Sequence, residues 1–199
     1  MTLISLPADQ RVPLPWKNGG GVTREVASFP PIGGLTDFDW RISLADVAVD
    51  GPFSAFDGYD RMIAVVAGAG MALTVDGTEH VVTRRPVPFA FSGASDTACR
   101  LLDGPIMDFN VMTRTGRVEA DVQVMAIGGT VGLRNSETDD TFVVVSFGGD
   151  TATATATVGG MPLGFLDAVV VRGGPDVSVT ADAGPSVAVV RLKQLSRQK

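Results

Sequence analysis

Two segments of the chain carry polar side chains at a spacing that could line a binding site. Successive side chains of a strand point to opposite faces, so Arg41 and Ser43 share one face of the predicted strand 40–46. The same alternation puts four functional groups on one face of the segment 107–114: Asp108, Asn110, Met112 and Arg114. Arginine can bind a carboxylate through two parallel hydrogen bonds. If these faces line a cavity, they predict a site for a small polar ligand, and an ordinary solvated surface is the alternative.

A glycine-rich segment near the N-terminus is the most unusual stretch of the chain. Residues 16–25 combine three consecutive glycines with an aromatic side chain, an amide and a charged pair: Trp16, Asn18, Arg24 and Glu25. Glycine permits positive φ and a close approach of the backbone, so this loop could offer amide N–H groups to an anion. The alternative is a tight turn that enters the first strand.

An aromatic loop spans residues 51–61. Phe53 and Ser54 lie in this loop, and Arg61 stands where the next strand begins. Phe53 and Phe56 could contact a ligand or, alternatively, cover the hydrophobic core. Arg61 could add a second positive charge to the same cavity.

The chain offers little for metal or nucleophilic chemistry. Metal centres of β-barrel enzymes use several histidines with a carboxylate, but His80 is the single histidine and a surface or hairpin position suits it. The one cysteine, Cys99, lies in an apolar segment without a neighbouring histidine, which favours an inert core thiol. Neither a Gly-x-Ser-x-Gly motif nor a P-loop is present. We therefore expect no metal and no cofactor.

The elements that must position these residues are short strands. Apolar segments recur at intervals of about ten residues, and the 24 Gly and 12 Pro residues supply the turns between them. Asp76-Gly77 is a strong signal for a hairpin turn. The clearest strands span 40–46, 61–67, 72–75, 80–83, 87–91, 98–102, 107–113, 122–126, 142–147, 168–172, 177–180 and 186–193. No long amphipathic helix is predicted, so the fold class is all-β.

Two stretches share a similar plan of strands, which favours two stacked β-barrels. The approximate halves are residues 1–115 and 116–199, and the N-terminal strand could pair with the second half. The alternating Thr/Ala segment 151–157 has no bulky side chain, so it predicts a weak edge strand, with a flexible loop as the alternative.

Charge and hydropathy exclude several classes of partner. The formal net charge is −6, which provides no basic surface for a nucleic acid. No apolar run approaches the roughly 20 residues that span a bilayer, and the N-terminus lacks the pattern of a secretory signal. We expect a cytoplasmic protein that binds neither nucleic acid nor membrane.

The segments with the candidate site residues resemble the HutD/Ves family of bicupins. Three segments match ordered motifs of this family: Trp16–Glu25, Trp40–Ser43 and Gly51–Arg61. Two later segments, Asp108–Met112 and Asp167–Val171, resemble two further elements of the family. The resemblance implies two cupin-like β-barrels or sandwiches packed as one compact bicupin without a catalytic metal. It also implies that the protein binds a small acidic metabolite, such as urocanate or formylglutamate, and moderates histidine utilisation. Some relatives are linked instead to stress responses.

The preferred hypothesis is a regulatory protein that binds a small carboxylate. The charge would come from Arg41 and Arg61 with Arg24 or Arg114, and the hydrogen bonds from Asn18, Ser43 and Asn110. The rival hypothesis is a metal-independent isomerase or lyase that acts on a small carboxylate with Glu25 or Asp108 as general base. A partner-binding module would instead expose a large apolar patch. The ligand's identity and the oligomeric state, including a homodimer, stay open.

Overall fold

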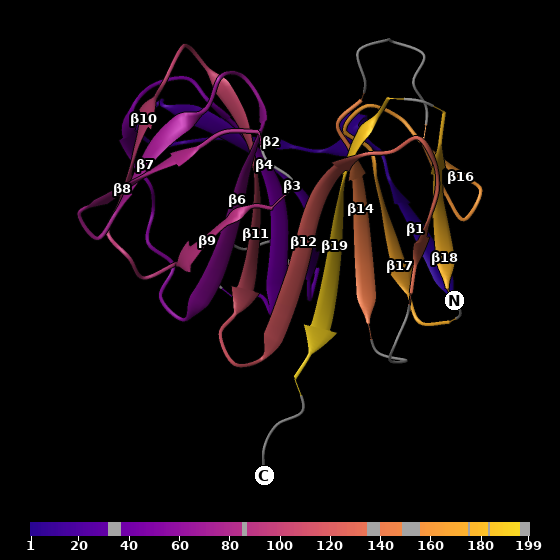
Figure 1. Ribbon diagram of the computed structural model, residues 1–199. Coiled ribbons are helices and arrows are strands. Elements are labelled where there is room, and N and C mark those ends of the chain that lie inside the picture. Colours follow the sequence, from indigo (N-terminus) through magenta and orange to yellow (C-terminus); the bar gives the residue numbers. More distant parts are fainter. Residues whose placement is uncertain are drawn as a thin grey trace. The chain divides into compact units, whose positions relative to one another are not determined.

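Strands make up nearly all of the regular structure (Figure 1). The computed structural model describes residues 1–31, 37–84, 87–134, 140–148, 156–174, 176–182 and 184–195. In these ranges the short 3₁₀ turn η1 (Ala8–Gln10) is the one helical element. The all-β class predicted from the sequence is therefore confirmed. No helix in this described part of the chain is long and apolar enough to cross a membrane.

The chain divides into two compact units. The central unit is Arg11–Val118, and the terminal unit combines Met1–Gln10 with Glu119–Lys199. The terminal unit is discontinuous in sequence because strand β1 (Thr2–Leu6) pairs antiparallel with β17 (Ala168–Arg172). Each unit contains two β-sheets that share a hydrophobic core, which is the arrangement of a β-sandwich.

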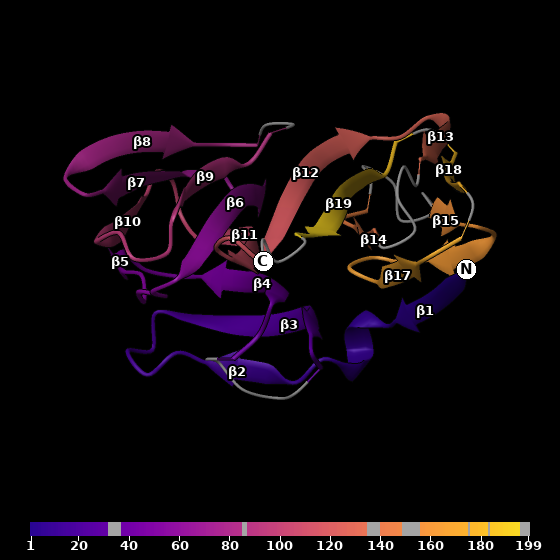
Figure 2. The same cartoon turned by 90° about the horizontal axis from the view of Figure 1, so that it is seen from below.

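The central unit packs a six-stranded sheet against a four-stranded sheet (Figure 2). In spatial order, the larger sheet contains β2 (Pro13–Pro15), β3 (Gly21–Phe29), β4 (Trp40–Val47), β11 (Ile106–Arg114), β6 (Tyr59–Ala67) and β9 (Phe89–Ser92). The smaller sheet contains β5 (Gly51–Pro52), β10 (Thr97–Leu101), β7 (Met71–Val75) and β8 (Thr78–Val82). Val47, Ile63 and Ile106 of the larger sheet meet Leu73 and Cys99 of the smaller one in the core.

The terminal unit has the same two-sheet plan. Its larger sheet contains β1, β17, β14 (Thr141–Ser146), β19 (Ser186–Gln194) and β12 (Val118–Ala126), in that order (Figure 1). Its smaller sheet contains β13 (Gly129–Leu133), β18 (Val177–Ala181), β15 (Ala156–Val158) and β16 (Met161–Leu163). The two sheets meet in a core in which Phe142, Val144 and Val169 pack with Val158 and Val179. Each of these residues is at most 5% exposed.

The Thr/Ala segment departs in part from the prediction of a weak edge strand. Residues 151–155 lie outside the described residues. Ala156 and Thr157 begin β15, which lies between β18 and β16 and is therefore an interior strand. Ala156 is fully buried, because its small side chain fits the core of the sandwich.

The hairpin predicted at Asp76-Gly77 is confirmed. These two residues join β7 to β8, and Val75 pairs with Thr78 across the turn. Their φ angles are 46° and 80°. Positive φ at both central residues is typical of a type I′ turn, whose twist matches that of the flanking strands.

Strand β3 was not among the clearest strands predicted from the sequence. The segment 16–25 forms the turn and the first part of a hairpin between β2 and β3, in which Pro15 pairs with Val22. Gly19 has a φ of 71°, and an added Cβ on Gly21 would lie 2.5 Å from the backbone oxygen of Asp46. The glycine run therefore serves a turn and a close backbone approach.

Candidate functional site

The larger sheet of the central unit carries a cluster of polar side chains on its inner face. The register places Ser43 of β4 between Glu25 of β3 and Asn110 of β11. Two residues along, Met112 of β11 lies between Arg41 of β4 and Arg61 of β6. We call this cluster the polar face and define it as Glu25, Arg41, Ser43, Arg61, Asp108 and Asn110. It is continuous with the apolar core formed by residues such as Ile63 and Val65 on the same strands.

A β-bulge in β3 places Glu25 and Ser28 on the same face of the sheet, beside Arg41. Glu25 pairs with Ser43, and Ser28 pairs with Arg41, because the register shifts between Glu25 and Ala27. Without this shift, residues 25 and 28 would point to opposite faces. Arg41 Nε donates a 2.8 Å hydrogen bond to Glu25 Oε2, and Ser28 Oγ donates a 2.7 Å hydrogen bond to Glu25 Oε1. The Arg41 side chain is only 4% exposed, so this ion pair holds a nearly buried guanidinium.

Arg61 is the second buried guanidinium of the polar face. Its Nε and Nη2 each lie 3.4 Å from Asn110 Oδ1, and its Nη1 lies 3.3 Å from the Ser54 carbonyl oxygen. Three aromatic rings surround the charge at 4.9 to 5.7 Å, those of Phe91, Phe53 and Phe56. Burial lowers the pKa of Arg61 from its ordinary value to about 10, Asp108 opposes this shift, and the charge of Arg41 adds to it. The two arginines are therefore close enough to affect one another.

Asp108 is a buried carboxyl near these arginines. Burial raises the pKa of Asp108 to about 7, the positive charge of Arg61 opposes the shift, and Asp46 adds to it. No hydrogen bond to its carboxylate is found within the part of the chain that the structure describes. At neutral pH both protonation states of this group are populated, so Asp108 can either donate or accept a hydrogen bond.

The thiol of Cys99, unlike the carboxyl of Asp108, stays in its protonated form at neutral pH. Cys99 is buried in the core, and its Sγ lies 3.6 Å from Met71 Sδ. Burial, with smaller contributions from Asp108 and Asp50, raises the pKa of the Cys99 thiol to about 12. The thiolate required for nucleophilic chemistry is therefore disfavoured at neutral pH.

The structure brings together most of the residues that the sequence analysis selected. Six form the polar face itself, and Phe53 and Ser54 contact Arg61. Met112 is 1% exposed and packs with Phe38 and Tyr59, so it separates the two arginines. Ser28 and Phe91 were not selected, although both contact the polar face. The pairing of Phe91 with Arg61 depends on the register between β6 and β9, which the sequence does not specify.

Trp16 and Asn18 lie in the hairpin turn and stabilise it. Trp16 Nε1 donates a 2.8 Å hydrogen bond to Thr23 Oγ1, and its ring contacts Phe53 edge to face. Asn18 Oδ1 accepts a 3.0 Å hydrogen bond from the backbone N–H of Gly20. The structure therefore gives these two residues intramolecular partners and does not place them in the polar face.

Arg24 and Arg114 also lie apart from the polar face. Arg24 forms an ion pair with Asp46, on the side of β3 opposite to its neighbour Glu25. Arg114 Nη2 donates a 2.6 Å hydrogen bond to Asp37 Oδ1, and its guanidinium lies over the Tyr59 ring at 5.1 Å. Two of the four predicted sources of positive charge thus have other partners.

Metal ligands do not cluster in the described ranges of the chain. These ranges contain no group of three or more His, Cys, Asp and Glu side chains that could hold a metal ion. His80 lies on β8 beside Phe89, with their ring centroids 4.6 Å apart. The chemistry available at the polar face is therefore that of two guanidiniums, two carboxyls, an amide and a hydroxyl.

Comparison with known proteins identifies related sequences. The family model described as HutD matches residues 8–189 of the chain. An uncharacterised 21.2 kDa protein in the hutC 3′ region of Pseudomonas putida is 46% identical over 114 residues, which are 55% of this chain and 57% of that protein. Protein Ves of Escherichia fergusonii is 39% identical over 111 residues, which are 55% of this chain and 56% of that protein. These alignments span little more than half the length of either relative.

Solved structures extend the similarity over nearly the whole chain. A conserved protein of unknown function from Pseudomonas aeruginosa PAO1 has a TM-score of 0.85 at 35% identity, covering 97% of this chain and 100% of that one. HutD from Pseudomonas fluorescens SBW25 has a TM-score of 0.82 at 37% identity, covering 98% and 100%. A nickel-bound bacterial pirin from Escherichia coli and a cupin barrel domain protein from Leptotrichia buccalis, with TM-scores of 0.71 and 0.55 at 9% and 12% identity, show the cupin-like fold alone.

Proposed function

Because the chain belongs to the HutD family, we propose that it binds a small acidic metabolite at the polar face and thereby moderates a catabolic pathway. The proposed pathway is histidine utilisation, and the proposed ligand is a carboxylate similar to urocanate or formylglutamate. A P. putida relative lies in the hutC 3′ region, and a solved relative from P. fluorescens is named HutD, which supports the choice of pathway. We further propose a regulatory role in the cytoplasm without a metal or cofactor.

One observation carries the proposal, which is the convergence of two nearly buried arginines on one sheet face. Arg41 and Arg61 are 4% and 6% exposed, and a single residue separates them across the sheet. Burying a charge is costly unless the charge is paired and hydrogen-bonded. Arg41 has a close carboxylate partner in Glu25, whereas the hydrogen bonds of Arg61 are long and go to neutral oxygens. Asp108 acts on Arg61 electrostatically but forms no ion pair with it among the described residues, so a ligand carboxylate would supply a directly paired negative charge.

The surroundings of Arg61 suit a flat or extended acid. Phe53, Phe56 and Phe91 present apolar surface around the guanidinium, and Asn110 and Ser43 lie on the same sheet face. Aromatic walls with a few convergent polar groups are typical of small-molecule sites. The carboxylate would contact Arg61, and the rest of the ligand would contact the aromatic rings.

Calorimetric titration with urocanate and N-formylglutamate tests this proposal. The unchanged protein and Arg100→Gln should bind the same acid equally well, because Arg100 is 56% exposed and pairs with Glu79 on the smaller sheet. Arg61→Gln and Arg41→Gln should weaken binding by about tenfold or more, since a charge-assisted hydrogen bond is worth about 1.5 to 3 kcal/mol. Equal affinity in all four proteins, or no binding at millimolar ligand, would count against the proposal.

The regulatory role needs a separate measurement in the native host. Cells that carry Arg61→Gln should lose the moderation of histidine degradation as fully as cells that lack the gene. Cells that carry Arg100→Gln should behave normally. Induction of the histidine-degrading enzymes after addition of histidine gives the comparison, and a normal response in the Arg61→Gln strain would contradict the role.

The raised pKa of Asp108 favours a second candidate function, metal-independent isomerase or lyase chemistry. A general base works best when its pKa lies near the working pH, and the pKa of Asp108 is about 7. Glu25 suits this role less well because Arg41 and Ser28 both bind its carboxylate. Nuclear magnetic resonance would follow conversion of the candidate acids. Turnover that is lost in Asp108→Asn and kept in Arg100→Gln would support catalysis, and no turnover in the unchanged protein would exclude it for the acids tested.

A further inference from the structure

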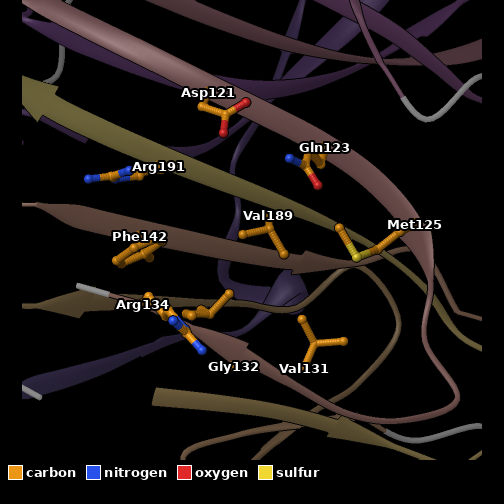
Figure 3. Close-up of a pocket in the computed structure, with 10 residues that line it drawn as sticks. Asp121, Gln123, Met125, Val131, Gly132, Arg134, Phe142, Val189 and Arg191 are labelled. Atoms are coloured by element: carbon orange, nitrogen blue, oxygen red, sulfur yellow. The ribbon is translucent and has the colours of Figure 1, made fainter. Parts of the chain in front are cut away.

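The terminal unit contains a cavity of about 170 Å³ between its two sheets. Its lining comes from three consecutive strands, β12, β13 and β14, and from β19 near the end of the chain (Figure 3). The volume corresponds to roughly six water molecules at about 30 Å³ each. This volume lies below the range of about 300 to 1,000 Å³ that is typical of sites for drug-sized ligands, so the cavity suits only a small metabolite.

One part of this cavity is apolar. Phe142 is 5% exposed, and it packs in the core of the terminal unit together with the partly buried Met125, Val131 and Val189. Figure 3 shows Met125 and Val131 toward one end of the cavity and the side chains of Arg134 and Arg191 toward the other. A ligand that fills the cavity would therefore need an apolar part and a polar part.

The polar part presents both signs of charge. Arg191 lies opposite Phe142 in the sheet, and the buried Asp140 holds its guanidinium through contacts of 2.9 and 2.6 Å to Oδ2. Asp121 lines the cavity from β12, and Arg134 lines it just after β13. Within the described residues, neither Asp121 nor Arg134 has a hydrogen bond or an ion pair. Both side chains are exposed, so the cavity offers an anionic and a cationic group at its rim, where a ligand can reach them from solvent.

We propose that this cavity binds a small aliphatic α-amino acid in its zwitterionic form. The ligand carboxylate contacts Arg134 and the anchored Arg191, and the ammonium group contacts Asp121. The aliphatic side chain lies against Met125 and Phe142. A zwitterion contacts Asp121 and the two arginines at once, whereas an acid or an amine alone contacts only one of the two charged sides, so the zwitterion should bind more tightly.

This proposal is independent of the proposed function, because it concerns another unit and another class of ligand. Loss of carboxylate binding at the polar face would leave it intact. The amino-acid site also differs from the polar face in composition, since it combines one acid and one base that have no partner among the described residues, at the edge of an apolar cavity.

Titration of the full chain with L-valine tests the proposal. Calorimetry should show that Asp121→Asn and Arg134→Gln each weaken L-valine binding by about tenfold. The matched controls Asp182→Asn and Arg100→Gln remove exposed charges elsewhere and should bind L-valine like the unchanged protein. The carboxylate 3-methylbutanoate and the amine isobutylamine should each bind at least tenfold more weakly than L-valine.

A nuclear magnetic resonance measurement locates the ligand. In protein labelled at the methionine methyl groups, L-valine should shift the Met125 signal, which Met125→Leu assigns. No binding at millimolar L-valine would overturn the proposal. So would binding that Asp121→Asn and Arg134→Gln leave unchanged, or binding that Arg61→Gln abolishes, because the last result would place the amino acid at the polar face.

Discussion

At the scale of single residues, Asp108 couples the stability of the protein to pH. Its pKa is about 7 in the folded chain, against about 3.9 in an unfolded chain. Between these values the folded chain keeps a proton that the unfolded chain releases, so the free energy of unfolding falls as pH rises. This loss of stability is absent below about pH 4 and grows up to about pH 7, where the free energy of unfolding has fallen by on the order of 4 kcal/mol.

Urea denaturation between about pH 5 and about pH 8 measures this effect. In Asp108→Asn the neutral amide releases no proton, so this variant should lack the part of the decline that Asp108 causes. The difference between the two stability curves removes the contribution of other titrating groups. Parallel curves for the unchanged protein and the variant would contradict the assignment.

Arg61 should act directly on the titration of Asp108. The positive charge of Arg61 lowers the pKa of Asp108 and opposes the larger effect of burial. Arg61→Gln removes this charge, so we expect the pKa of Asp108 to rise further above its value in the unchanged protein. The carbon-13 chemical shift of the Asp108 carboxyl carbon, followed by nuclear magnetic resonance over a pH titration, measures this pKa directly. A pKa that stays the same in Arg61→Gln and Arg100→Gln would show that the two groups are not coupled.

The members of the polar face could be selected from the sequence, but their partners could not. Strict alternation placed Arg41 with Ser43 and Asp108 with Asn110, because side chains of a strand alternate between faces. Arg114 lies four residues after Asn110 and therefore points to the same side of the strand, yet it contacts Asp37 and Tyr59 beyond the end of the polar face. Such partners depend on strand register and loop paths. The pKa of Asp108 likewise depends on burial from all sides.

At the scale of the elements, the hairpin of β2 and β3 depends on the absence of a side chain at Gly21. An added Cβ there would lie 2.5 Å from Asp46 O and 3.1 Å from the Trp16 ring. Gly21→Ala should therefore destabilise the protein by about 1 to 3 kcal/mol, the usual range for overpacking. Thermal unfolding followed by circular dichroism measures the change.

A matched glycine variant serves as the control for this prediction. Gly128 has no heavy atom within 4 Å of an added Cβ and is not among the glycines with positive φ. Gly128→Ala should therefore change stability by less than about 0.5 kcal/mol, as surface substitutions do. Equal effects of the two substitutions would show that the contacts of Gly21 do not matter.

Turn chemistry was easier to predict than irregular strands. Asp76-Gly77 specifies its turn through the φ angles that these residues tolerate, so the hairpin could be identified locally. β3 lacks a regular apolar alternation because its bulge falls between Glu25 and Ala27. The cavity of the terminal unit was also missed. The alternation of Asp121, Gln123 and Met125 is visible in the sequence, but the facing residues come from three other strands.

At the scale of the whole molecule, each of the two units builds a sandwich, but they are assembled differently from the sequence. The central unit uses one continuous segment, whereas the terminal unit needs Met1–Gln10 to complete its larger sheet. The similar strand plans of the two halves indicated two barrels. The sequence analysis gave the second half as a possible partner of the N-terminal strand but named no strand in it, because pairing over such a distance has no local signal. The structure pairs it with β17.

Deletion of Met1–Leu6 should weaken the terminal unit selectively. β1 pairs with β17 over five residue pairs, and Leu3 packs on the core of the terminal unit. Its loss would expose the edge of β17 and remove the partly buried side chain of Leu3, at a cost of roughly 2 to 3 kcal/mol. Hydrogen exchange followed by mass spectrometry should show reduced protection in Ala168–Arg172. Protection of β4 and β11 should stay close to that of the full chain, because β1 belongs to neither sheet of the central unit. An equal loss of protection in β4 would mean that the two units unfold together, and unchanged protection of β17 would mean that β1 adds little to its sheet.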